Sequence, residues 1–150
     1  MTVTVKGGAG ILEFRLKISD LGLAKLAAMD CNPDAMKDRT KRFALQVIRL
    51  CRNTKPSQER RIIVRQLLRS ATSVAANYRA VCRARSRPDF ISKLGIILEE
   101  ADESLFWLEL LVEAGIASPD VIKLSLKEAN ELVSIFVTSL RTAKGLQSPI

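Results

Sequence analysis

The chain has 150 residues, of which 24 are Lys or Arg and 16 are Asp or Glu, giving a formal net charge of +8, and it contains no histidine. The absence of histidine excludes Ser-His-Asp triads, Cys-His dyads and the usual histidine-based zinc and di-iron sites. A hydrophobic content of 47% excludes a disordered chain. We therefore expect a single non-enzymatic domain without a cofactor or a metal.

Three cysteines at irregular spacing provide neither a disulfide framework nor a CxxC metal clip, which favours a reduced, cytoplasmic compartment. The N-terminus lacks the basic start and apolar run of a secretory signal. No run of about 18 uncharged apolar residues occurs, so we expect no membrane association.

The first 35 residues differ in pattern from the rest of the chain. Between Leu12 and Ile18, apolar residues alternate with charged ones, a period of two that predicts a short strand. No partner strand is evident in the sequence, so this segment is expected either to pair with another chain or to be poorly ordered. A weakly helical stretch follows and stops near Asn32 and Pro33. We predict an N-terminal arm over residues 1–35, a domain over 36–145 and a frayed tail over 146–150.

From about Asp34 onward the chain shows the three- and four-residue apolar spacing of amphipathic helices, interrupted by capping and turn signals. The first helix is expected to end at the segment 53–56, and the second to begin after Ser57 or Thr54. The second helix carries a run of small residues at 70–76, which favours close packing against a neighbour. The third helix is predicted from the N-cap Ser86 to Gly115, and the fourth from the N-cap Ser118 to Gly145.

Four long helices joined by short loops predict an all-α fold, an antiparallel up-down four-helix bundle with crossing angles of about 20°. One apolar stripe per helix suffices for such a core. The third and fourth helices carry apolar residues beyond their main stripes, which favours a second interface, so we expect a homo-oligomer. The residues assigned to that interface are Trp107, Phe106, Leu124, Leu132 and Ile135.

Positive charge is concentrated in the first half of the predicted bundle. Residues 37–93 contain sixteen basic and three acidic residues, a net charge of +13, whereas residues 94–150 contain four basic and nine acidic residues, a net charge of −5. Arginine forms bidentate pairs with phosphates, so a cluster of arginines favours binding to RNA or DNA. The residues predicted to bind nucleic acid are Arg60, Arg61, Arg65, Arg69, Arg79, Arg83, Arg85 and Arg87.

Aromatic residues are nearly absent from this basic segment, since Tyr78 is the only one between Phe43 and Phe90. We therefore expect contacts with the nucleic-acid backbone and shape rather than base stacking. Two alternatives stay open. The arginines could form a solvated stripe, or they could face the acidic third helix of the same or a neighbouring subunit.

The third helix carries an acidic cluster of Glu99, Glu100, Asp102, Glu103 and Glu109. Carboxylates this close could hold a divalent cation, but ion pairs with Arg65 or Arg69 are the favoured use. Asn77 is a poor helix former, and we expect its amide to fix the register of packed helices through a hydrogen bond. Cys51 and Cys82 are predicted to be small core residues rather than reactive thiols.

Two segments carry a resemblance to a known family. They are residues 66–79 (QLLRSATSVAANYR), followed by 82–86 (CRARS), and residues 93–111 (KLGIILEEADESLFWLELL). Together they resemble the bacterial four helix bundle proteins, which include proteins encoded within intervening sequences of 23S ribosomal RNA genes. The similarity runs from about Asp38 to Leu140. Many members have Ile-Ala-Glu-Gly after the asparagine, whereas this chain has Tyr78-Arg79-Ala80-Val81.

The resemblance implies a small bundle that assembles as a ring of five, with a suspected role in nucleic-acid binding. A related branch, the accessory variability proteins of diversity-generating retroelements, is also pentameric and associates with a reverse transcriptase and its RNA. An alternative function is therefore a scaffold that binds a protein such as a reverse transcriptase. Family members usually begin close to the position of Met36, so translation from Met29 or Met36 stays open.

Overall fold

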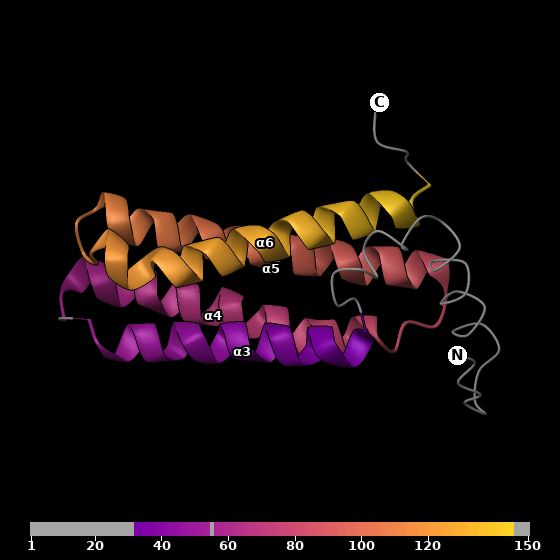
Figure 1. Ribbon diagram of the computed structural model, residues 1–150, viewed down its shortest axis with the longest axis horizontal. Helices are drawn as coiled ribbons and strands as arrows, with labels where there is room; N and C mark the ends of the chain where they lie inside the picture. The colour runs from indigo at the N-terminus through magenta and orange to yellow at the C-terminus, as the bar shows by residue number, and fades with distance from the viewer. Residues whose placement is uncertain (1–31, 55, 146–150) are drawn as a thin grey trace.

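The computed structural model describes residues 32–54 and 56–145, and these residues form four α-helices. They are α3 (Pro33–Arg52), α4 (Gln58–Val81), α5 (Arg87–Glu113) and α6 (Pro119–Ala143). Figure 1 shows that consecutive helices run in opposite directions along one long axis. The predicted all-α, up-down four-helix bundle is confirmed. The predicted strand at 12–18, the tail over 146–150 and residues 1–31 of the predicted arm lie outside the described residues.

Capping residues explain where the helices begin. Asn32 caps α3, where its side chain accepts a hydrogen bond from the Asp34 backbone N–H at 3.1 Å, and Pro33 occupies the first helical turn. The helix begins at Pro33, one residue before the helical pattern predicted from about Asp34 and three before the predicted domain boundary at residue 36. Ser57 and Ser86 cap α4 and α5 through their side chains, as predicted.

The helix ends follow the same local rules. Gly115 and Gly145 have φ angles of 69° and 73°, a left-handed conformation that is strained for residues with a side chain. They directly follow the C-caps Ala114 and Lys144 of α5 and α6. The predicted stop signals at these two glycines are confirmed.

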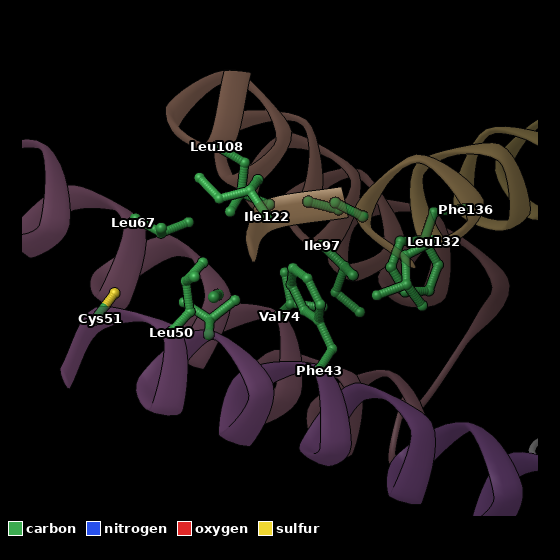
Figure 2. Packing of buried hydrophobic residues seen from close by; sticks show 14 of the residues in the cluster. Phe43, Leu50, Cys51, Leu67, Val74, Ile97, Leu108, Ile122, Leu132 and Phe136 are labelled. Carbon is green, nitrogen blue, oxygen red and sulfur yellow. The ribbon is translucent and has the colours of Figure 1, made fainter. Parts of the chain in front are cut away.

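The core is built from aliphatic side chains and two phenylalanines. Phe43 of α3 lies against Val74 and Ile97 in the centre of the bundle, and Leu132 lies beside Phe136 towards one end (Figure 2). Tyr78 extends this packing, since its ring stacks on Phe136 with a centroid distance of 6.3 Å. Residues from all four helices therefore share one apolar interior.

Hydroxyl residues occupy several core positions. Thr40, Ser70 and Ser104 are fully buried, and each donates a hydrogen bond to a carbonyl of its own helix, for example Thr40 to Met36 at 3.0 Å. These bonds satisfy the hydroxyl groups, so the residues can lie in the interior without a desolvation penalty.

The most extensive contact between helices is the one between α4 and α5. Here the Oγ atoms of Ser70 and Ser104 lie 2.9 Å apart, and the neighbouring Ala71 is fully buried. Small side chains in the middle of α4 therefore allow α5 to approach closely, as the run at 70–76 predicts.

α3 and α6 have the smallest contact of the four adjacent helix pairs, and an ion-pair cluster joins them. Arg39 of α3 donates to Glu128 at 2.6 Å and to Glu131 at 2.5 Å. The hydrogen bond that Arg39 donates to Glu128 is the main cause that raises the pKa of Arg39. None of the described helices is long and apolar enough to cross a membrane.

Candidate nucleic-acid interface

Four arginines form two pairs, Arg61 with Arg65 and Arg79 with Arg83; the first three lie on the outward face of α4, and Arg83 lies in the turn two residues after its end. All four are exposed, and none forms an ion pair with any described residue. Eighteen residues, or five helical turns, separate Arg61 from Arg79, so these two share one face of α4 and lie about 27 Å apart. Arg83 lies next to Arg79, because its Nε donates to the Arg79 carbonyl at 3.3 Å. We call these four residues the arginine row.

Small side chains separate the two pairs of the arginine row. Thr72 and Ala76 are exposed on the same face of α4, midway between the pairs. Thr72 directs its hydroxyl to the Leu68 carbonyl at 2.7 Å and so projects little from the helix. A long polyanion can therefore lie along the helix without a side chain that obstructs it between the two cationic ends.

Three of the eight predicted nucleic-acid residues are engaged in contacts with other elements of the chain, whereas Arg83 bonds only to the Arg79 carbonyl four residues before it. The Arg60 guanidinium, which is half-buried, donates to the Thr54 hydroxyl and to the Cys51 carbonyl at the end of α3. Arg87 donates from Nε to the Ala143 carbonyl at 2.8 Å, at the end of α6. These arginines bind helix carboxyl ends, where cations are favoured.

Arg69 is the third engaged arginine, and it pairs with α5. Its guanidinium donates to Glu103 and lies 3.6 Å from a carboxylate oxygen of Glu100. The bond to Glu103 raises the pKa of Arg69 and, together with a 3.0 Å bond from the Trp107 indole, lowers the pKa of Glu103. The predicted pairing of the acidic cluster with Arg69 is confirmed within one chain, whereas Arg65 forms no such pair with a described residue.

Glu100 has the least favourable environment of the acidic cluster. Its side chain is 18% exposed, and its Oε2 atom is buried without a hydrogen-bond partner. Burial is the main cause that raises the pKa of this carboxyl, against the opposing effect of Arg69. Glu100 is thus only partly compensated by the cation beside it.

Arg85 lies in the turn between α4 and α5, where it is exposed and extends the positive charge of Arg83. Its backbone N–H donates to the Asp89 carboxylate at 2.9 Å, and Lys93 bonds the same carboxylate at 2.5 Å. The bond from Lys93 is the main cause that lowers the pKa of Asp89. The turn is therefore held by Asp89 while the Arg85 side chain stays available.

A second set of cations lies on α3 and was missed by the predicted site. These residues are exposed on the outward side of the helix and form no ion pair with described residues: Lys41, Arg42, Arg49 and Arg52. Lys41 and Arg42 lie between the buried Thr40 and Phe43, Arg49 lies between Val47 and Leu50, and Arg52 follows Cys51. Helical periodicity could therefore have identified them.

The remaining acidic residues of α5 point outward. Glu99, Asp102 and Glu109 are exposed and form no ion pair with described residues. Within the described part of the chain no three carboxylate or thiol groups are placed to hold a metal ion. Glu99, Asp102 and Glu109 therefore present exposed negative charge on the outward side of α5.

The five residues predicted for the oligomer interface have different environments. Phe106 and Leu124 are 51% and 71% exposed, while Trp107 and Ile135 are half-buried against the core. Leu132 is fully buried, and its assignment to an outer face is wrong. The buried stripe of α6 passes through Ser125 and Leu132. Because a serine does not count as an apolar residue, the apolar spacing alone did not place Leu132 on this stripe.

Two further predictions concern Asn77 and the cysteines. No hydrogen bond of the half-buried Asn77 amide is found within the described residues, so its predicted role in helix register is not supported. Cys51 is buried and unpaired, and burial raises the pKa of its thiol to about 11. A thiol with such a pKa is a weak nucleophile near neutral pH, as expected for a core residue.

Comparison with known proteins places the whole bundle in one family. The model of the 23S rRNA-intervening sequence protein family matches residues 35–138. The chain belongs to this family. It is also 32% identical to a protein of unknown function from the S23 ribosomal protein family of Bacteroides thetaiotaomicron, whose crystal structure superposes with a TM-score of 0.64. That similarity covers 70% of this chain and 97% of the other. No curated protein matches the chain.

Proposed function

We propose that this intervening-sequence family protein is a non-enzymatic homo-oligomer that binds RNA, or another polyanion, through the arginine row of α4. The observation that carries the proposal is the pair of cationic clusters about 27 Å apart on one helix face, unneutralised by any described carboxylate. A family encoded within ribosomal RNA insertions makes RNA the natural polyanion to test first.

The chemistry of the row favours phosphate contacts. Guanidinium groups bind phosphate oxygens bidentately, and each neutralised phosphate releases counterions. Within the described residues α4 has no exposed aromatic side chain, so base stacking has no platform on this face. We expect binding that depends steeply on salt and weakly on sequence, with a structured RNA bound through its backbone.

Assembly and location complete the proposal. The family resemblance makes the oligomer a ring of five, in which several arginine rows would act on one RNA and increase its affinity. A buried, unreactive Cys51 is compatible with the cytoplasm, where ribosomal RNA is found.

The test is RNA retardation by the full chain at 50 and 200 mM salt. With four phosphate contacts per subunit we expect affinity to fall about 10²-fold between these concentrations. Replacing Arg61, Arg65, Arg79 and Arg83 by Gln should abolish most binding. The slope of log affinity against log salt concentration should decrease in magnitude by about one unit per lost contact.

A matched control removes the same charge elsewhere. Lys123, Lys127, Arg141 and Lys144 are exposed on or beside α6, and replacing them by Gln lowers the net charge equally. This variant should keep most of the affinity. Absence of retardation at 50 mM salt, or equal losses in both variants, would show that the arginine row is not an RNA site.

A second candidate function is a scaffold for a protein partner, and the start of α6 favours it. Val121 and Leu124 are 57% and 71% exposed there, more than an isolated bundle needs. Replacing both by Ser should leave RNA binding unchanged. Loss of a copurifying partner from this variant alone would favour the scaffold.

A further inference from the structure

The outward side of α5 carries an apolar residue between carboxylates. Phe106 is 51% exposed, and its ring packs edge-on against Trp107 with ring centroids 4.8 Å apart. Exposed carboxylates lie three to seven residues to either side, and none is paired with a described cation. We call this set the acidic face, which consists of Glu99, Asp102, Phe106, Glu109 and Glu113.

The outward side of α3 has the same pattern with the opposite charge. Leu45 is 39% exposed at its centre. Exposed cations lie three to seven residues to either side, again without an ion pair to a described residue. We call this set the basic face, which consists of Lys41, Arg42, Leu45, Arg49 and Arg52.

The spacing of the two faces matches residue by residue. If Leu45 lies on Phe106 with the helices antiparallel, Arg49 meets Asp102, Arg52 meets Glu99, and the cations at 41 and 42 meet Glu109. If the helices are parallel, Arg49 meets Glu109 and Arg52 meets Glu113. Either direction therefore joins an apolar centre to flanking ion pairs.

The two faces cannot meet within one subunit. α3 and α5 each pack against α4 and α6 and are diagonal in the bundle, so their outward sides point away from each other (Figure 1). A contact between them requires a second copy. Because each copy presents one basic and one acidic face, such a contact is head-to-tail and closes into a ring when the rotation permits.

α4 fits the acidic face less well, although it is also basic. The residues at the centre of its outward side are Thr72 and Ala76, which provide no apolar side chain to cover Phe106. Ile62 is 59% exposed near the start of α4, but Glu59 lies three residues before it, so cations do not flank it on both sides as they flank Leu45. The arginine pairs of α4 are also spaced more widely than the carboxylates around Phe106. The arginine row therefore stays free for RNA when the basic face of α3 is covered.

We infer that the basic face of α3 docks on the acidic face of α5 of a second copy of this chain, with Leu45 on Phe106. This inference rests on the oligomeric part of the proposed function and assigns its interface. The Leu45–Phe106 contact excludes water at the centre, and the surrounding charges select the register and exclude wrong pairings, because like charges would face each other there.

The experiment measures the mass of the full chain by light scattering at low and high salt, with a subunit mass of 16.6 kDa. Reversing two charges of the basic face, R49E with R52E, should shift assembly to at least tenfold higher concentration. Adding E99R and D102R should restore assembly if the helices are antiparallel, whereas adding E109R and E113R should restore it if they are parallel. Circular dichroism verifies that each variant keeps its helices.

A matched control reverses the same number of charges on α4, R65E with R83E, and this variant should assemble as the wild type does. If the wild-type chain is a monomer, both the oligomeric proposal and this inference fail. If the wild type assembles but neither charge swap restores the basic-face variant, or the α4 variant dissociates equally, only this interface is overturned.

Discussion

The arginines show how strongly the role of a single residue depends on its neighbours. Arg60 and Arg87 bind carbonyls at helix ends, Arg69 joins α4 to α5, and the arginine row remains exposed. All of them lie on α4, in the turn after it or at the start of α5, but the partners of Arg60, Arg69 and Arg87 come from α3, α5 and α6. Their separation into structural and available residues was therefore not predictable from α4 alone.

Glu100 provides a prediction at this scale. Burial raises the pKa of Glu100 in the folded state. The free energy of unfolding therefore falls as pH rises from the unfolded pKa of this carboxyl to its folded pKa. Glu100→Gln cannot ionise, so it should increase the free energy of unfolding at pH 7 by about 1 kcal/mol, near the cost of an unpaired buried polar atom. Urea unfolding at neutral and acidic pH measures this gain, which should vanish where Glu100 is protonated.

Glu103 is the control for that experiment and should behave in the opposite way. Its pKa is lowered mainly by the hydrogen bond from Arg69, so it stabilises the fold above its unfolded pKa and loses this effect as pH falls. Glu103→Gln should therefore destabilise the chain at pH 7. A shift of both variants in the same direction would contradict the assigned environments.

Helix boundaries were the most predictable feature at the scale of secondary structure. Ser57, Ser86 and Gly115 act through local hydrogen bonds and backbone conformation, which a short sequence window contains. The faces of the helices were less predictable. Ser104 and Ser125 occupy core positions that an apolar stripe omits, and this omission placed Leu132 on the wrong side of α6.

The close contact of α4 with α5 predicts a contrast between two alanines of α4. Ala71 is fully buried, whereas Ala76 is exposed five residues further along the same helix. Ala71→Leu should reduce the free energy of unfolding by about 1–3 kcal/mol through overpacking. Ala76→Leu should change it by less than about 0.5 kcal/mol. Denaturant unfolding compares the two, and equal effects would argue against the close approach.

The whole molecule is divided by charge into a basic pair of helices, α3 and α4, and an acidic α5. Only part of this charge is neutralised inside the subunit, chiefly by Arg39 and Arg69. The segment charges of +13 and −5 predicted a basic and an acidic part of the molecule. They did not predict which charged residues pair inside the subunit and which lie on its outward faces. That division depends on which helices are diagonal, a property of the bundle rather than of any segment.

Assembly through the basic and acidic faces has a thermodynamic signature. A partner that binds only the folded subunit raises its melting temperature as protein concentration rises. Scanning calorimetry of the wild-type chain at two concentrations should show this increase. Leu45→Glu, which places a carboxylate against the acidic face, should remove the dependence. A concentration-dependent melting temperature in this variant would count against Leu45 as an interface residue.

An even number of antiparallel helices gives the bundle a polarity. The start of α3 and the end of α6 lie at the same end, while the turns after Arg52 and after Glu113 lie at the other (Figure 1). Rotation about a ring axis copies this polarity from subunit to subunit. Where the helices run parallel to that axis, the start of α3 and the end of α6 of every subunit therefore lie at one rim of the ring. The turns after Arg52 and after Glu113 lie at the opposite rim.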